Sequence, residues 1–430
     1  MKHPRIAGTA ALLTAVALTA ACSSGGDGGD GGASPSGTGP ITVWLSNNEQ
    51  EVGWGQDVVD AWNAEHPDEE VTAQEIPAGS SSEEAITAAI TAGTAPCLVY
   101  NISSAAVPGW VRQGGLVNLS QFEDGTSYIE ERVGEGAQTY LTDDGYYQLP
   151  WKSNPVMVMY NKTVFEEAGL DPENPDMATY DDFLAGSRKI VESGAADSAI
   201  WPSPTNEFFQ PWFDFYPLYL AESGGTSLVE DQQATFDDEN GKAVADFWAT
   251  IYSEGLAGNE AYNGDAFADK QSAMAIVGPW AIAVYGDSVN WGSVPVPTQD
   301  GMDPSEVYTF SDAKNIGMFT ACDNQATAWD VLKFSTSEEQ DGKWLESTGQ
   351  MPLRQDLTGT YPDYFSANPA YEQFGDQAAR TVEVPNVPNS VEIWQEFRDG
   401  YSKAVIFGEE EVSTFLKDAA DKADSLASQG

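Results

Sequence analysis

The residue types that perform nucleophilic or metal chemistry are sparse in this sequence. The 430 residues include only two histidines, His3 and His66, and three cysteines. Because His3 falls in an expected export signal, a Ser-His-Asp or Cys-His arrangement would depend on His66 alone. A zinc site would need His66 together with Cys97 and Cys322, without any paired-ligand spacing. The sequence therefore argues against both kinds of site, and no cofactor or metal is expected.

Carboxylates are abundant, with 67 acidic residues against 19 Lys and Arg and a formal net charge of −48. So acidic a chain repels nucleic acid, anionic membranes and anionic substrates, and neutral or cationic ligands remain. A glycosidase needs two carboxyl groups at a defined separation, and among so many acids some pair by chance. A secreted glycan-active hydrolase therefore remains open as an alternative.

Aromatic residues give the positive signal. The chain has 13 tryptophans, and several stand in polar, turn-rich surroundings: Trp44, Trp151, Trp201, Trp212, Trp280 and Trp394. A flat ring can stack on the apolar face of a pyranose while neighbouring polar side chains bind the hydroxyl groups. Any one of these rings could equally be part of a core. As a set, they favour a carbohydrate site.

The first 39 residues are expected to export and tether the protein. Lys2 and Arg5 precede a short apolar run, which is typical of a signal peptide over residues 1–21. The run ends at Cys22 after two alanines, which resembles the lipobox of bacterial lipoproteins, although Thr19 stands where leucine is usual. A secretory signal with a chance cysteine is the alternative. Residues 22–39 are rich in Gly, Ser and Asp and predict a flexible tether.

Strands and helices alternate from Ile41 onward, which predicts an α/β fold with a largely parallel sheet. The run "ITVWL" and the segment "CLVYNI" read as strands. Between them, "SSSEEAITAAITAG" predicts a helix with a capping box from Ser81 to Glu84 and an end at Gly93. Further on, "WPSPTNEFFQPWFDFYPLYL" is an aromatic-rich stretch.

Four segments in order resemble one protein family. They are "VMYNKTVFEEAGLDPENP" with "TYDDFLAGSRKI", then "DAFADKQSAMAIVGPWAI", "STGQMPLR" and "PNVPNSVEIWQEFR". Together they are similar to blocks of the family 1 extracellular solute-binding proteins, the maltose-binding-protein-like carbohydrate receptors of ABC importers. The resemblance implies a binding protein, not an enzyme. It would be a monomer that captures a neutral sugar, expected to be an oligosaccharide, and delivers it to ABC permease subunits.

The resemblance also implies a fold, a two-lobed periplasmic-binding-protein fold (type II, Venus-flytrap) with lobes that are discontinuous in sequence. Lobe one would comprise residues 40–152 and 310–350, and lobe two residues 153–309 and 351–430. The lobes would close over the ligand about crossing strands. The protein would lie outside the cytoplasm and meet the membrane only through a lipid on Cys22.

Ligand contacts are implied by the same resemblance, residue by residue. The rings of Trp280 and Trp394 correspond to family positions that pack on the sugar. Weaker correspondences indicate further contacts at Asn48, Glu49, Ser103, Asn154, Trp212 and Asp312. If Glu49 and Asp312 flanked the aromatic residues, a receptor for a cation such as a polyamine would be the alternative.

Cys97 and Cys322 are predicted to form a disulfide. In the family, the strands that carry these positions lie in the same sheet, and disulfides persist in exported proteins. Two buried free thiols are the alternative.

Overall fold

The computed structural model describes residues 36–78, 81–142, 144–201, 207–286 and 288–429, which belong to one compact unit. The expected signal peptide, Cys22 and most of the expected tether lie outside these residues. Within the described ranges, no helix is long and apolar enough to cross a membrane.

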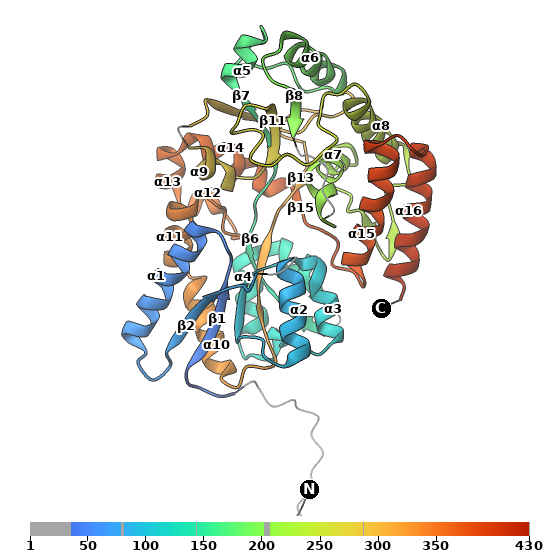
Figure 1. Cartoon of the computed structure of the whole chain (residues 1–430). Coiled ribbons are helices and arrows are strands. Elements are labelled where there is room, and N and C mark those ends of the chain that lie inside the picture. The colour runs from blue at the N-terminus through green and yellow to red at the C-terminus, as the bar shows by residue number, and fades with distance from the viewer. Residues whose placement is uncertain (1–35, 79–80, 143, 202–206, 287, 430) are drawn as a thin grey trace, which may run out of the picture. The chain divides into compact units, whose positions relative to one another are not determined.

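A five-stranded sheet organises the first lobe (Figure 1). Its strands, in spatial order, are β2 (Val71–Glu75), β1 (Ile41–Leu45), β3 (Leu98–Ile102), β14 (Lys314–Met318) and β6 (Leu149–Lys152). The strand β1 is parallel to β2 and β3, whereas β14 runs antiparallel to β3 and β6. A segment more than two hundred residues downstream therefore completes the first sheet, as the discontinuous fold requires.

Helices flank this sheet. They are α1 (Glu49–Glu65), α2 (Ser82–Ala92), α3 (Val107–Arg112), α4 (Gly125–Val133), α10 (Gln325–Ser335) and α11 (Glu338–Thr348). The predicted capping box is confirmed in part, because the Ser81 hydroxyl accepts a hydrogen bond from the Glu84 amide at 3.2 Å. Gly93 ends α2 in the left-handed conformation, as expected. The helix α1 packs against α11 over a core that contains Trp54, Trp151 and Trp344.

A four-stranded sheet organises the second lobe, in the order β12 (Trp291–Val294), β7 (Met157–Asn161), β11 (Ser272–Val277) and β8 (Ser198–Trp201). Its larger core is closed by aromatic and aliphatic residues from helices that include α6 (Tyr180–Ser193), α7 (Phe215–Glu222), α8 (Glu239–Ser253), α15 (Ser390–Tyr401) and α16 (Val412–Ala427). The other face of β7 packs with α9 (Trp280–Tyr285), α12 (Leu357–Thr360), α13 (Pro362–Ala367) and α14 (Pro369–Gln377).

Short elements complete the chain. They are α5 (Lys162–Glu167), the pairs β4 (Leu141–Thr142) with β5 (Gly145–Tyr146), β9 (Val229–Glu230) with β10 (Gln233–Ala234) and β13 (Thr309–Phe310) with β15 (Thr381–Val382), the 3₁₀ turns η1 (Ser104–Ala106), η2 (Leu119–Gln121), η3 (Gly134–Tyr140), η4 (Gln210–Phe213) and η5 (Ala378–Arg380), and the π-helical turn η6 (Ser402–Ile406).

The chain crosses between the sheets at 153–156, at 311–313 and at 349–356. These crossing segments are bonded to one another. Pro155 forms a bridge with Ser311, and Lys152 forms one with Pro352. The lobes are therefore joined by neighbouring segments that lie between the named helices and strands. In hinge closure, a few residues of such connecting segments take up the change in backbone angles.

The two cysteines of the predicted pair meet in this structure. Cys97 and Cys322 are bonded, with a Cα–Cα separation of 4.6 Å, which lies within the range that a disulfide spans. Cys97 stands just before β3 and Cys322 follows β14, and these strands are neighbours in the first sheet. The bond therefore fastens the return segment to the beginning of the chain inside one lobe.

Candidate functional site

One edge of the first sheet gathers polar residues from distant parts of the chain. The strands β1 and β3 end at this edge, and are followed by Asn48 and Ser103. The strands β14 and β6 are antiparallel, and Lys314 at the start of β14 lies opposite Lys152 at the end of β6. The start of β14 and the end of β6 therefore reach the same edge. The topology thus brings Lys152 and Lys314 beside the loops that carry the predicted residues.

Asn48 and Ser103 shape this edge. The Asn48 side-chain oxygen accepts hydrogen bonds from the amides of Gln50 and Glu51 and so caps α1. The Ser103 hydroxyl accepts from the Ala105 amide and starts η1. Ser103 is buried, Asn48 is half-buried, and Glu49 is an exposed residue of the first turn of α1. The bonds of Asn48 and Ser103 hold the loops at the strand ends in place, and a ligand contact at these three residues stays a prediction.

Asn154, a predicted ligand contact, is enclosed within the protein. Its side chain is 1% exposed, donates to the Gln350 side chain at 2.9 Å and accepts from the Met351 amide. These bonds tie the first crossing segment to the third. In this conformation Asn154 has a structural role, because its amide is enclosed and engaged in bonds within the protein.

A chain of aromatic contacts runs through the second lobe from Trp280 to Trp394. The ring centroids are separated by 6.1 Å for Trp280 and Phe213, 5.7 Å for Phe213 and Phe310, 5.6 Å for Phe310 and Trp212, and 5.8 Å for Trp212 and Trp394. Trp280 and Phe213 are half-buried, whereas Trp212 is 3% and Trp394 is 0% exposed. Trp280 and Phe213 therefore form the accessible end of the chain.

The structure corrects the expected role of Trp394. Its ring is enclosed by Trp212, Tyr216 and Phe397 in the core of the second lobe, so no face is open to a ligand in this conformation. The core interpretation, which the sequence also allowed, describes this residue. Phe213 is an accessible ring that the sequence reasoning missed within its aromatic-rich stretch.

Gly278 explains how the Trp280 ring is held. A Cβ atom on Gly278 would lie 1.8 Å from Cζ3 of Trp280, so the ring folds back over the glycine backbone. Only a residue without a side chain leaves room for this close approach. The "GPW" sequence after β11 therefore fixes the ring orientation through the glycine.

Lys314 links the two lobes at this place. Its ammonium nitrogen lies 5.6 Å from the centroid of the Trp212 ring and 3.3 Å from a carboxylate oxygen of Asp312, and both charged side chains are 19% exposed. Burial opposes the positive charge on Lys314, but the negative charges of Asp312, Glu83 and Glu51 outweigh it and raise the pKa. Asp312 is therefore the partner of a lysine that sequence reasoning did not single out.

A second lysine lies deeper. Lys152 is 2.7 Å from Glu51, and Gln350 donates to the same carboxylate oxygen at 2.7 Å. Burial opposes ionisation of Glu51, but the charge of Lys152 and hydrogen bonds from Lys152, Ser46 and Gln350 lower the pKa of this carboxyl. Both lysines at the edge are thus neutralised by carboxylates of their own lobe.

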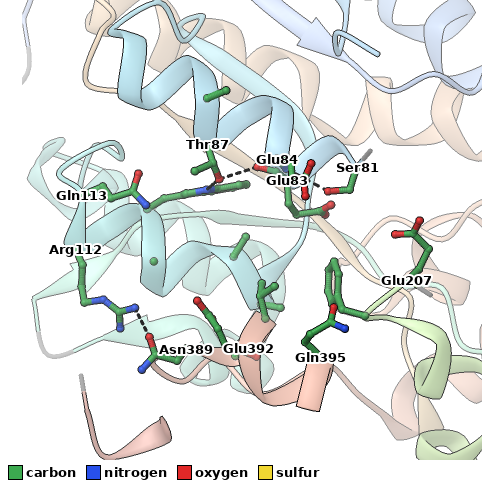
Figure 2. A pocket seen from close by; sticks show the side chains of 18 residues that line it. Ser81, Glu83, Glu84, Thr87, Arg112, Gln113, Glu207, Asn389, Glu392 and Gln395 are labelled. Carbon is green, nitrogen blue, oxygen red and sulfur yellow. Dashed lines mark hydrogen bonds between the residues drawn. The ribbon is translucent and has the colours of Figure 1, made fainter. Parts of the chain in front are cut away.

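A cavity of about 740 Å³ adjoins this region (Figure 2). Its walls come from α2, η1 and α3 of the first lobe and from residues 207–208 and α15 of the second lobe. The Arg112 guanidinium donates to the Asn389 side chain at 2.7 Å across the two lobes. Glu83 lines the cavity and also acts on Lys314. None of the eight predicted contact residues is among the described residues that line this cavity. Its lining residue Phe208 has its ring centroid 5.6 Å from that of Trp212, so the cavity is next to the aromatic contacts, and we call the two together the cleft.

The comparisons with known proteins agree with this architecture. Residues 57–373 match the family of bacterial extracellular solute-binding proteins. The chain belongs to this family. Among curated relatives, the diacetylchitobiose binding protein DasA of Streptomyces coelicolor is 24% identical over 411 residues, which cover 90% of each chain.

Solved structures share the fold of this solute-binding protein. The cyclic alpha-maltosyl-1,6-maltose binding protein of Arthrobacter globiformis superposes with a TM-score of 0.76 at 21% identity, and covers 92% of this chain and 100% of its own. The GacH receptor of Streptomyces glaucescens, solved unliganded and with acarbose, gives a TM-score of 0.76 at 20% identity and covers 91% and 99%. At such identities the likeness establishes the two-lobed fold.

Proposed function

We propose that this solute-binding protein captures a neutral oligosaccharide in the cleft and delivers it to an ABC permease. The observation that carries the proposal is the chain of aromatic contacts from the accessible rings of Trp280 and Phe213 to Trp212. The Trp212 ring lies 5.6 Å from the Lys314 ammonium group at the strand edge of the opposite lobe. A sugar presents apolar C–H faces to aromatic rings and hydroxyl groups to polar side chains. Relatives support the substrate class, since their names include diacetylchitobiose-, arabinooligosaccharide- and maltotriose-binding proteins.

The charges of the cleft favour a neutral ligand. Lys314 and Lys152 are each paired with a carboxylate of the first lobe, so neither offers an unneutralised charge to an anionic sugar. The pairing of Asp312 also weakens the cation-receptor alternative at this site, which required Asp312 to face the ligand. The glycan hydrolase alternative is tested by incubating oligosaccharides with the protein, because a receptor returns them uncleaved.

Ligand binding would act through lobe closure. A sugar that touches Trp280 and the edge of the first sheet at once makes its full set of contacts only in the closed form. Binding therefore shifts the population toward closure, by as much as the affinities for the two forms differ. The permease would then recognise the closed form. Arg112 and Asn389, which bond across the lobes, would be among the contacts that closure makes.

Alanine in place of Trp280 is expected to weaken sugar binding by about 1–3 kcal/mol, the scale for nucleic-acid bases stacked on aromatic rings. Calorimetric titration with a panel of oligosaccharides measures this loss. Since the ring is half-buried, the melting temperature without ligand should change little. Trp394→Ala is the matched variant, and is expected to lower the free energy of unfolding by about 3 kcal/mol because it empties a core position. Unchanged affinity in Trp280→Ala would contradict the assignment of the cleft.

Membrane attachment is proposed to depend on Cys22. Family membership places the protein outside the cytoplasm, and the lipobox-like sequence provides a cysteine for acylation. In a host that processes lipoproteins, Cys22→Ser should move the protein from the membrane fraction to the soluble fraction. The secretory alternative predicts the same soluble distribution for both forms, so fractionation of the unaltered protein decides between them.

A further inference from the structure

Glu383 reaches from the second lobe into a polar network of the first lobe. Its backbone follows β15, and its carbonyl accepts a hydrogen bond from the Tyr216 hydroxyl of α7 at 2.7 Å. One residue earlier, the Val382 carbonyl accepts from the amide of Ser311 in the second crossing segment at 3.0 Å. The Glu383 carboxyl group, in contrast, lies 2.8 Å from the hydroxyl of Ser104 in η1 of the first lobe. This side chain therefore connects the lobes beside a segment that joins them.

The network around Ser104 has one hydroxyl proton for two acceptors. The Ser104 oxygen lies 2.8 Å from a carboxyl oxygen of Glu383 and 3.3 Å from the side-chain carbonyl of Gln148, the residue before β6. Asn315 of β14 uses both of its amide protons, because it donates to Ser104 and to Gln148, each at 2.8 Å. If Glu383 is ionised, the single Ser104 proton serves only one of its two neighbours. A protonated Glu383 donates to Ser104 instead, and the Ser104 proton then goes to Gln148.

No cation forms an ion pair with Glu383 among the residues that the structure describes. The titratable side chains on the elements around it are Tyr216 of α7, Lys152 of β6, Lys314 of β14, Arg380 before β15, and Tyr140, Glu230, Arg354 and Asp356, which line the same cavity wall as Glu383. Three of the four cations are paired with other carboxylates, namely Lys152 with Glu51, Lys314 with Asp312 and Arg354 with Asp341. Arg380 donates to backbone carbonyls. An ionised Glu383 would therefore have no counter-charge.

Burial also opposes a charge on this carboxyl group. The Glu383 residue is 9% exposed. Among the described residues, its second oxygen is buried without a hydrogen-bond partner, as is the side-chain nitrogen of Gln148. A buried group without a counter-charge keeps the form that is neutral. Burial raises the pKa of Glu383 to about 8, although the bond with Ser104 acts in the opposite direction. The proton count and the burial thus agree on a neutral acid at pH 7.

We propose that Glu383 is a proton-dependent clasp between the two lobes. In the neutral form its carboxyl proton is donated to Ser104 and the Ser104 proton to Gln148, so the second lobe is bonded to the network of the first. When the carboxyl proton is lost to solvent, an uncompensated charge remains at the joint. The carboxylate then moves toward water, and its contact with Ser104 breaks. Because Ala105 and Ala106 of the same turn line the cavity of the cleft, the clasp also holds part of the cleft wall.

The clasp makes the stability of the protein depend on pH. A carboxyl group whose pKa is higher in the folded protein than in the unfolded chain contributes stability that is complete below the unfolded pKa. This contribution is lost as the pH rises through the folded pKa. For Glu383 the pKa window extends from the ordinary glutamate value of 4.5 to about 8. Within it, this one group increases the unfolding constant by up to about tenfold per pH unit.

The test is urea denaturation of the unliganded protein and of two variants across this pH window. Glu383→Gln has the shape of the neutral acid and donates to Ser104 from its amide, so it should keep the clasp at every pH. The unfolding constant of the unaltered protein, divided by that of Glu383→Gln, should rise about a hundredfold or more between about pH 5 and about pH 8. Glu260→Gln removes an exposed carboxylate of the second lobe, and should follow the unaltered protein throughout.

Small-angle X-ray scattering of the same proteins distinguishes a clasp from a buried acid inside a rigid joint. The radius of gyration of the unaltered protein should increase over this pH range as the lobes separate, and that of Glu383→Gln should stay constant. Equal pH dependence of stability in these two proteins would overturn the proposal. So would a radius of gyration that is constant in the unaltered protein, or that increases equally in both. A Glu383→Gln chain that does not fold would also contradict it, since the amide supplies the donor of the neutral acid.

Discussion

Replacing Cys97 and Cys322 together by serine is expected to lower the free energy of unfolding by about 5 kcal/mol, which is the largest single effect that we predict. The bond joins residues 225 positions apart, and the chain-entropy model assigns about 4–5 kcal/mol to loops of a hundred residues and more. Equilibrium denaturation in urea measures the change. Strain and residual unfolded structure make the figure an upper bound.

Sugar affinity should survive this change. Both cysteines belong to the first lobe, at the ends of β3 and β14 away from the edge that carries Ser103 and Lys314. The bond therefore leaves the crossing segments free to move. Unaltered protein in reductant should match the double serine variant in stability. Two free thiols titrated in the unfolded, unreduced mature protein would refute the pairing, as would a double variant that is as stable as the parent.

Local sequence signals were sufficient for much of the fold. Ser81 and Glu84 specify a helix start through bonds within one turn, and Gly93 marks its end, so this helix could be read directly. The alternation of strands and helices indicated the parallel part of the first sheet. The return of β14 could not be read from local signals, because its partners β3 and β6 lie far away in the chain. It was predicted through the family resemblance.

The site was less accessible to sequence reasoning, since burial depends on neighbours that are distant in sequence. Trp280 and Trp394 occupy similar turn-rich contexts, yet one ring is half-buried and the other is enclosed by Trp212 and Tyr216. Lys314 was missed for the same reason. Its partner Asp312 is near in sequence, but only the tertiary fold places its ammonium group over the Trp212 ring.

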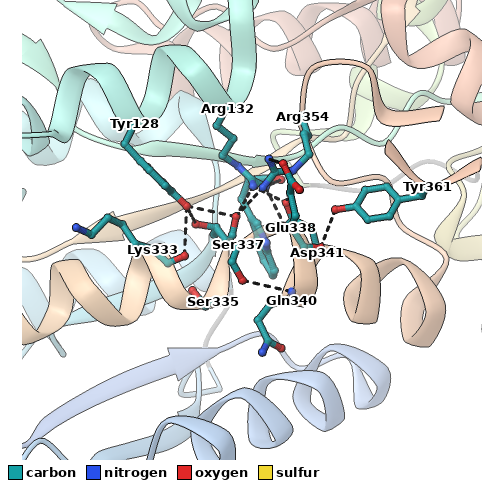
Figure 3. A network of polar contacts seen from close by, with 12 residues as sticks. Tyr128, Arg132, Lys333, Ser335, Ser337, Glu338, Gln340, Asp341, Arg354 and Tyr361 are labelled. Carbon is teal, nitrogen blue, oxygen red and sulfur yellow. Dashed lines mark hydrogen bonds and ion pairs between the residues drawn. The ribbon is translucent and has the colours of Figure 1, made fainter. Parts of the chain in front are cut away.

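A buried charge network fastens the first lobe to the third crossing segment (Figure 3). Asp341 of α11 is fully buried and receives hydrogen bonds from Arg132 of α4, at 3.1 Å to one oxygen, and from Arg354, at 2.9 Å to the other. Both guanidinium groups also donate to the Thr336 carbonyl. The two guanidinium groups thus share one buried carboxylate as their counter-charge. Arg354 also forms an ion pair with the exposed Glu338, at 3.5 Å.

Asparagine in place of Asp341 is therefore expected to lower the free energy of unfolding by about 3–5 kcal/mol. It keeps the shape but leaves the buried Arg132 guanidinium without a counter-charge, and it removes the nearer carboxylate partner of Arg354, which is 13% exposed. This figure is the cost of removing one partner. The net contribution of the network to stability is smaller, because well-packed apolar residues of similar volume can stabilise a fold as much as a buried ion pair does.

Glu338→Gln is the matched control for this prediction. The Glu338 side chain is 73% exposed, so its loss should cost no more than about 1 kcal/mol. Urea denaturation of the two variants beside the parent measures the contrast. The difference should shrink little in high salt, because solvent ions do not reach the buried pair. Equal, small losses in both variants would show that the guanidinium groups find other partners or water, and the network would then lose its assigned role in joining α4, α11 and the crossing segment.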